Sequence, residues 1–168
     1  MRVRQWYAQL DVFDTVRRYT ALMSRWSGEG PTRERLFVSD FYLANPSLLH
    51  ETKMTSDARK AFNMLRVPRA DQIFLRLPSA AVLYQKMSGI QSEALHNMLG
   101  RGLCDLRVAD SGRFQLSEEG KEFAHSLGRT LVLPLESDVV DFLTSEFKMV
   151  GAERGGLRAA TGLTRIGT

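Results

Sequence analysis

A helix that is apolar on all sides, at residues 34–43, constrains the fold more than any other feature of the sequence. Its large apolar residues are spread around the helix rather than along one face: Leu36, Phe37, Val38, Phe41, Tyr42 and Leu43. Such a helix must be surrounded by other elements, so we expect it to be deeply buried. Pro46 ends it, because proline has no backbone N–H and disfavours helical geometry at the residue before it.

An amphipathic helix is expected just before this segment, over residues 11–26. Its apolar residues recur at spacings of three and four, which is typical of a helix packed on a core through one face. They are Val12, Val16, Tyr19, Met23 and Trp26. Further helices are expected at residues 56–65 and from Pro134 to Val150, and the predicted core residues are Phe37, Phe41, Leu43, Leu95 and Leu99.

The order of elements over residues 79–127 suggests a winged helix. Two helices, 80–87 and 91–101, are separated by Ser88-Gly89. Residues 103–108 then alternate partly with period two, and residues 113–116 follow a turn signal, so a β-hairpin is expected. Ser117 is placed to cap the next helix. Helix, helix, hairpin and helix in this order are typical of winged-helix domains.

The predicted fold class is therefore mostly α with a small β-hairpin: a winged-helix-type domain with additional N- and C-terminal helices. One domain is expected over residues 1–150, because a chain of 168 residues fits a single core. Residues 151–168 are rich in glycine and poor in apolar residues, which predicts a flexible tail. With no apolar run near the ~20 residues of a membrane span and no signal-peptide pattern, a cytoplasmic location without membrane contact is expected.

The sequence offers little for catalysis, and we predict that the chain is not an enzyme and holds no cofactor or metal. His50, His96 and His125 form no pair with metal-ligand spacing. Cys104, the single cysteine, excludes an internal disulfide and has no basic neighbour in sequence that would lower its pKa. A small enzyme using Cys104 or the histidines remains a third hypothesis.

Asp40 is a carboxylate inside the apolar segment, and its role is left open by the sequence. It is either a polar edge of a buried helix, an acid that faces a partner, or an acid neutralised by a buried arginine.

The basic residues are concentrated at the two ends of the chain. The net charge is +4 and the isoelectric point about 9.5, but residues 36–150 hold thirteen basic and fourteen acidic residues. Helix 91–101 would offer DNA bases Gln91, Ser92, His96, Asn97 and Arg101, whereas the expected wing carries no net charge to grip phosphates.

The denser basic cluster comes earlier in the sequence, between residues 53 and 76. It consists of Lys53, Arg59, Lys60, Arg66, Arg69 and Arg76, opposed only by Asp57 and Asp71. As candidate contacts with a partner or with nucleic acid we take two sets, one from this cluster and one from the last helix: Arg59, Lys60, Arg66, Arg69 and Arg76, and Phe142 and Phe147.

One motif connects the chain to a known family. Asp40-Phe-Tyr-Leu43 is followed by Pro46, Leu48 and Leu49, and later come Gln85-Lys-Met87, Ala94-Leu95 and Gly102-Leu103. Over about residues 10–130 the chain thus resembles the middle components of bacterial ABC-three-component systems, which include the Lamassu anti-phage and anti-plasmid group.

The resemblance implies a non-catalytic subunit between an SMC-like (structural-maintenance-of-chromosomes-like) ATPase and an effector, often a nuclease. It also implies partners within the same system, with nonspecific DNA contact inside the complex as a further expectation. The alternative is a winged-helix transcriptional regulator that binds DNA. The predicted hairpin supports that alternative, and the neutral charge of the hairpin opposes it.

Overall fold

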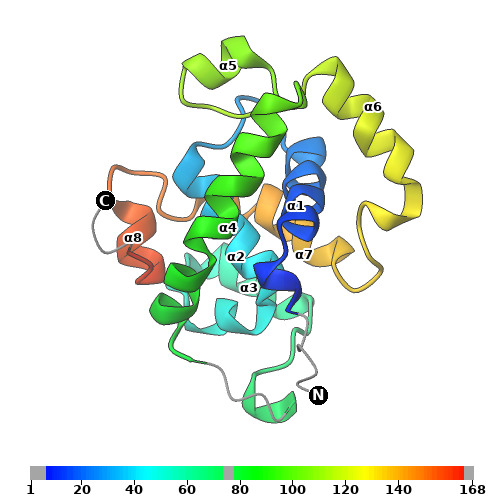
Figure 1. Cartoon of the computed structure of the whole chain (residues 1–168). Coiled ribbons are helices and arrows are strands. Elements are labelled where there is room, and N and C mark those ends of the chain that lie inside the picture. The colour runs from blue at the N-terminus through cyan, green and yellow to red at the C-terminus, as the bar shows by residue number, and fades with distance from the viewer. Residues whose placement is uncertain (1–6, 74–77, 165–168) are drawn as a thin grey trace.

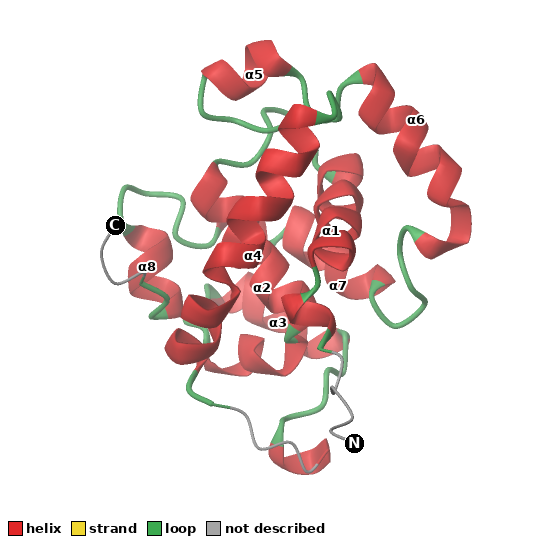
Figure 2. Cartoon of the chain, viewed as in Figure 1, coloured by secondary structure: helices red, strands yellow, loops and turns green. Residues whose placement is uncertain are grey.

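The part of the chain that the structure describes is a helical assembly without a sheet. The computed structural model describes residues 7–73 and 78–164, and no β-strand occurs among them (Figure 2). The α-helices are α1 (Val12–Arg25), α2 (Arg33–Ala44), α3 (Ser56–Met64), α4 (Ala80–Gly100), α5 (Leu106–Asp110), α6 (Glu118–Leu127), α7 (Ser137–Thr144) and α8 (Gly156–Thr161). Short 3-10 helices are η1 (Ala8–Leu10), η2 (Pro46–Glu51), η3 (Asp71–Ile73), η4 (Gly128–Thr130) and η5 (Phe147–Met149).

Helix α2 lies inside the assembly, with α1, α4 and α7 packed against it (Figure 1). Every residue from Arg35 to Leu43 is buried, as expected for a helix that is apolar on all sides. Phe41 makes edge-to-face contacts with Tyr42 and Tyr84, with ring centroids 5.2 and 5.5 Å apart. The core prediction is confirmed for Phe37, Phe41, Leu43 and Leu95, while Leu99 is half-buried at the edge of the core.

Helix α1 contacts α2, α4, α6 and α7, so the N-terminal helix is also a central element. The residue before it, Asp11, is its N-cap: the side chain accepts a hydrogen bond from the backbone N–H of Asp14 at 2.9 Å and so satisfies a free donor of the first turn. Tyr19 and Met23 from the expected apolar stripe are buried, and the Tyr19 ring stacks on Phe37 with centroids 6.0 Å apart. The predicted amphipathic helix is confirmed.

The two helices expected at 80–87 and 91–101 are one continuous helix, α4. Glycine inside a helix costs only about 1 kcal/mol relative to alanine, and Gly89 is exposed where no packing depends on a side chain. Met87 and Gln91 on either side of it are fully buried. Packing on the core therefore outweighs the local preference for a break.

The winged-helix prediction, with its small β-hairpin, is wrong. Residues 106–110 form α5 instead of a strand, because the Asp105 side chain accepts hydrogen bonds from the backbone N–H groups of Arg107 and Val108 and caps a helical turn. Only isolated bridges remain in this part of the chain, Cys104 with Leu116 and Thr32 with Arg113. The bridge between Thr32 and Arg113 requires glycine at position 30, because a Cβ atom there would lie 1.9 Å from the carbonyl oxygen of Phe114.

The C-terminal part of the chain adds two helices to the assembly. Helix α7 begins at Ser137 rather than at the predicted Pro134, and Leu135 is almost fully exposed. Within residues 151–164, α8 places Leu157 in the core cluster, and the backbone N–H of Lys53 donates to the carbonyl of Ala160 at 2.9 Å. The domain boundary at residue 150 and the flexibility of the tail remain predictions.

Candidate partner-binding surface

The basic residues predicted as contacts divide into two kinds. Lys60, Arg66 and Arg69 are exposed, and the side chain of each is available to a partner. Arg59 is half-buried, donates to the carbonyl oxygen of Thr52 and lies 5.6 Å from the centroid of the Phe62 ring, so it has a structural role. Arg76 lies outside the described residues.

The predicted aromatic contacts, Phe142 and Phe147, are buried inside the folded chain. Their side chains are 2% and 0% exposed, and their ring centroids lie 6.0 Å apart. Phe147 also makes an edge contact with Tyr42, and Phe142 a tilted contact with Phe62. In this conformation both residues hold the core together rather than form a docking face.

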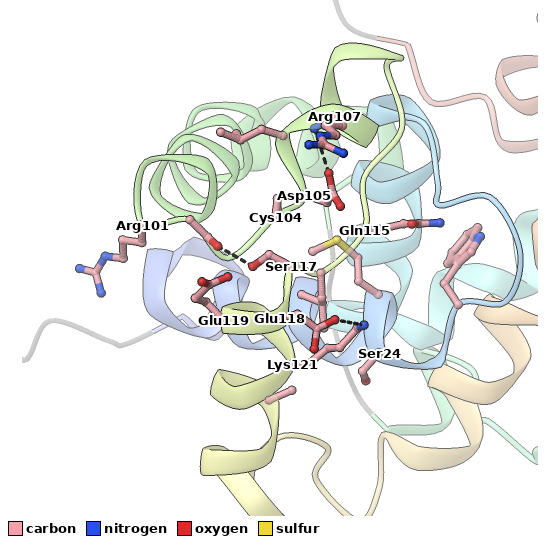
Figure 3. Close-up of a pocket in the computed structure, with 16 residues that line it drawn as sticks. Ser24, Arg101, Cys104, Asp105, Arg107, Gln115, Ser117, Glu118, Glu119 and Lys121 are labelled. Carbon is pink, nitrogen blue, oxygen red and sulfur yellow. Dashed lines mark hydrogen bonds and ion pairs between the residues drawn. The ribbon is translucent and has the colours of Figure 1, made fainter.

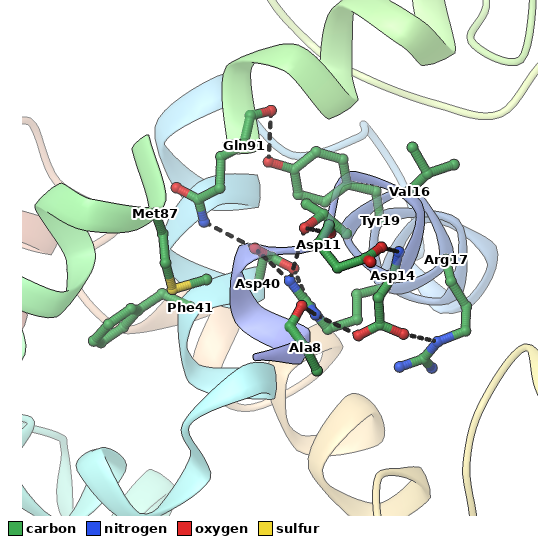
Figure 4. Close-up of polar contacts among 12 residues, drawn as sticks. Ala8, Asp11, Asp14, Val16, Arg17, Tyr19, Asp40, Phe41, Met87 and Gln91 are labelled. Carbon is green, nitrogen blue, oxygen red and sulfur yellow. Dashed lines mark hydrogen bonds and ion pairs between the residues drawn. The ribbon is translucent and has the colours of Figure 1, made fainter. Parts of the chain in front are cut away.

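Asp40 belongs to a buried polar cluster between α1, α2 and α4 (Figure 4). Its carboxylate is fully buried and accepts a hydrogen bond from Arg18 Nε at 2.6 Å. Arg18, itself 1% exposed, also pairs with Asp14 at 2.6 Å. Burial lowers the pKa of Arg18, but the charge and hydrogen bond of Asp40 outweigh this effect and raise the pKa. Asp40 is thus an acid neutralised by a buried arginine, one of the three roles that the sequence left open.

Gln91, a candidate base reader under the winged-helix hypothesis, is part of the same cluster. Its side-chain amide donates to the carbonyl oxygen of Phe37 and to Asp40 Oδ2, each at 2.9 Å. Figure 4 shows Gln91 directed toward Asp40, in the interior. A residue in this position cannot contact a base. The regulator hypothesis therefore lacks both the predicted β-hairpin wing and one of the residues that were expected to contact bases.

A pocket of about 1130 Å³ beside α5 and α6 contains Cys104 (Figure 3). The thiol is buried, and burial raises its pKa to about 11, so it stays protonated at neutral pH and is a poor nucleophile. Some polar groups around it contact one another: Ser117 donates to the carbonyl of Gly102 at 2.5 Å, and Lys121 pairs with Glu118 at 2.6 Å.

An apolar groove lies between α1 and α6, the helix at the edge of the molecule in Figure 1. We call it the α1–α6 groove. Its volume is about 520 Å³. It is lined by Asp11, Val12, Phe13, Asp14, Val16, Arg17, Asn97, Met98, Arg101, Leu103, Phe123 and Leu127.

Aromatic and aliphatic side chains from both helices form the walls of this groove. Phe13 is 76% exposed, and Phe123 and Leu127 on α6 are half-buried. Helix α6 turns its small residues, Gly120 and Ala124, toward the body of the protein. Its larger apolar residues are left to line the groove. An exposed apolar surface framed by polar residues is typical of a site for protein binding.

The charged residues at the groove differ in what they can offer a partner. Arg17 is engaged by Glu136 at 2.7 Å and Asp14 at 2.8 Å, and these contacts raise its pKa against the lowering effect of burial. Arg101, at the C-terminal end of α4, is exposed. The groove therefore combines apolar walls with one accessible positive charge on its rim.

Sequence reasoning missed this groove, although two signals were present. Phe13 is a large apolar residue off the stripe that packs α1 on the core. Phe123 and Leu127 are four residues apart, which places them on one face of a helix. A second apolar face on each of two helices is the pattern that could have indicated a groove.

Two other kinds of site do not occur in the part of the chain that the structure describes. Among residues 7–73 and 78–164, no group of three or more His, Cys, Asp or Glu residues is arranged to hold a metal ion. Within the same ranges, no helix has the length and apolar character needed to cross a membrane.

Comparison with known proteins gives a match to a protein family. No curated protein and no solved structure matches the chain. The sequence profile of the ABC-three component (ABC-3C) system Middle Component 5 matches residues 5–166, nearly the whole chain. This match confirms the resemblance to middle components of ABC-three-component systems that the Asp40-Phe-Tyr-Leu43 motif indicates. The chain belongs to the Middle Component 5 family of ABC-three-component systems.

Proposed function

We propose that the chain is a non-catalytic adaptor that joins an SMC-like ATPase, of the kind found in Lamassu-type defence, to an effector such as a nuclease. Membership of a middle-component family supports a role inside a multi-component assembly. The observation that carries the docking part of the proposal is the α1–α6 groove, an open apolar surface with an exposed aromatic side chain.

The proposed occupant of the groove is an amphipathic helix of another component of the same system. A groove walled by α1 and α6, with the end of α4 beside them, accepts the apolar face of a further helix, with anchor side chains at i, i+3 or i+4, and i+7. Phe13, Phe123 and Leu127 would contact those anchors. Because Arg101 is the exposed charge on the rim, the matching helix should carry a carboxylate beside its apolar face.

Replacing Phe13 with aspartate should weaken the binding of the partner while leaving the fold intact. Loss of an aromatic anchor costs about 2 kcal/mol or more of binding free energy, which corresponds to roughly a thirtyfold weaker complex. The test is co-expression of the tagged variant with the other components of its system, followed by quantitative pull-down and a thermal melt. Since Phe13 is 76% exposed, the melting temperature should stay close to the wild-type value.

Met64→Asp is the matched control, because Met64 is a comparably exposed apolar residue, 81% exposed, at the end of α3 and away from the groove. It should co-purify like the wild type. Wild-type recovery of both partners with Phe13→Asp would contradict docking in the groove. Elution of the wild-type chain as a lone monomer, with and without ATP, would contradict the adaptor role itself.

A nonspecific DNA contact is proposed for the exposed cations Lys60, Arg66 and Arg69. The log–log slope of DNA affinity against salt falls by about one unit for each phosphate that the protein no longer neutralises. The triple variant Lys60→Gln, Arg66→Asn, Arg69→Gln should therefore reduce the slope for the assembled complex by about 2–3. Asparagine is chosen at Arg66 because its φ of 54° lies in the left-handed region, which asparagine tolerates.

Fluorescence anisotropy between 50 and 200 mM salt measures the slope. A triple variant at the exposed cations Lys86, Arg107 and Arg129 is the control, since it removes the same charge elsewhere. If both triple variants change the slope equally, the effect comes from net charge and the proposed contact is wrong.

A further inference from the structure

The core contains two buried arginines with different electrostatic surroundings. Arg18 forms ion pairs with Asp40 and Asp14, each at 2.6 Å. Arg35, on α2, is 8% exposed, but within the described part of the chain no carboxylate oxygen lies within 4.0 Å of its guanidinium. Its Nη1 donates to the carbonyl oxygen of Phe147 at 3.1 Å, and the guanidinium lies 5.8 Å from the centroid of the Phe147 ring.

The pKa values of these arginines shift in opposite directions. Burial lowers the pKa of Arg35, and the more distant charges of Glu34 and Glu153 do not restore it. For Arg18, the carboxylate partners overcome the same effect of burial. The positive charge of Arg35 is therefore only partly compensated by the chain itself, and an anion beside it would stabilise it.

Arg35 lines a pocket of about 640 Å³, together with residues 26–29, 31, 32 and 34, Arg113, and residues 148, 149, 151–155 and 157. We call it the Arg35 pocket. Its lining holds three further cations, Arg113, Lys148 and Arg154, and the first two contact mainly neutral groups. Lys148 Nζ donates to Ser27 Oγ at 2.8 Å, and Arg113 donates to the carbonyl oxygen of Gly30 at 3.1 Å.

Three acidic residues also line the Arg35 pocket, and none of them forms a close ion pair with Arg35. Glu34 is engaged by Arg158, with Nε and Oε1 2.7 Å apart. Glu29 is mostly exposed and lies 3.8 Å from Arg113, a loose contact. The side chain of Glu153 is folded against Gly156, where even a Cβ atom would meet it at 2.3 Å. The lining therefore carries four cations against three carboxylates, a surplus of one positive charge, and the carboxylates do not fully compensate Arg35.

We propose that the Arg35 pocket binds the phosphate group of an organic ligand of nucleotide size. A phosphate carries about two negative charges and several acceptor oxygens, so it can engage Arg35, Lys148 and Arg113 together. The volume lies within the range of small-molecule sites, about 300–1,000 Å³. Trp26 also lines the pocket and gives the organic part of the ligand an apolar, aromatic surface.

This site shares no lining residue with the α1–α6 groove, so it can be tested on the purified chain independently of the adaptor proposal. The probes are inorganic phosphate, AMP and ATP, with adenosine and acetate as controls at constant ionic strength. Calorimetry gives the dissociation constants. At a hundredfold excess over its dissociation constant, AMP or ATP should raise the melting temperature by roughly 5–10 °C, and adenosine and acetate should not.

Arg35→Met should abolish the ligand-induced shift while leaving the melting temperature without ligand within a few degrees of the wild type, because the removed charge is poorly compensated. Lys148→Gln should weaken ligand binding about tenfold. The control is Lys86→Gln, because Lys86 is an exposed lysine outside the pocket. This variant should bind the ligand like the wild type.

Three results would overturn the proposal. The first is a shift with the phosphate compounds that is no larger than that with acetate. The second is wild-type binding by both Arg35→Met and Lys148→Gln. The third is a response to single-stranded DNA but not to mononucleotides. If Arg35→Met fails to fold, the ligand affinity of Lys148→Gln decides whether the proposal is supported or rejected.

Discussion

Asp40→Ala is expected to lower the free energy of unfolding by about 3–5 kcal/mol, the usual cost of leaving one partner of a buried ion pair uncompensated. Arg18 would keep Asp14 and the carbonyl oxygen of Ala8, but it would lose the carboxylate that lies in the interior beside it. Gln91 would lose an acceptor as well. Urea denaturation followed by circular dichroism measures the change as a lower midpoint.

The double variant Arg18→Met, Asp40→Leu is the control for this interpretation. Apolar residues of similar volume often replace a buried ion pair without loss of stability, so the double variant should be more stable than Asp40→Ala. A single variant within 1 kcal/mol of the wild type would show that Asp40 is not needed to neutralise Arg18.

Phe41→Ala is expected to cost about 3–5 kcal/mol, because it removes a large buried side chain and leaves a cavity. The ring is fully buried and contacts both Tyr42 and Tyr84, so its neighbours cannot easily close the space. The melting temperature should fall by roughly 6–20 °C. Phe13→Ala, at an exposed phenylalanine, should change stability by about 0.5 kcal/mol or less. A Phe41→Ala melt within a degree of the wild type would contradict the placement of Phe41 in the core.

The helices near the N-terminus could be predicted because local and tertiary preferences agree there. Asp11 caps α1, the stripe through Tyr19 and Met23 faces the core, and Pro46 follows the end of α2. The same agreement holds at Ser117, whose hydroxyl accepts from the backbone N–H of Gly120 at 3.0 Å and caps α6.

The winged segment was predicted wrongly because its local signals are balanced. Period-two alternation over residues 103–108 favours a strand, while Asp105 favours a helix start at the same place. Nothing in the sequence ranks one above the other. Gly89 presents a similar problem, since a glycine breaks a helix or is tolerated according to the packing around it, which the sequence does not display.

The family motif and the candidate sites depend on different residues. Asp40, Phe41, Tyr42 and Leu43 are all buried, as are Leu48 and Leu49 after the proline. The motif therefore reports how the interior is built, and it indicates the family without indicating any surface. The groove and the Arg35 pocket are formed by residues far apart in sequence, which only the folded chain brings together.

The central position of α1 has a consequence for synthesis on the ribosome. Arg17 pairs with Glu136, a residue 119 positions later, and Arg25 pairs with Asp141. At about 5–20 residues per second, α1 leaves the ribosome roughly 6–24 s before the segment that covers it. During this interval α1 lacks its contacts with α7, including both of these ion pairs. The nascent chain is then a natural substrate for chaperones that bind emerging polypeptides.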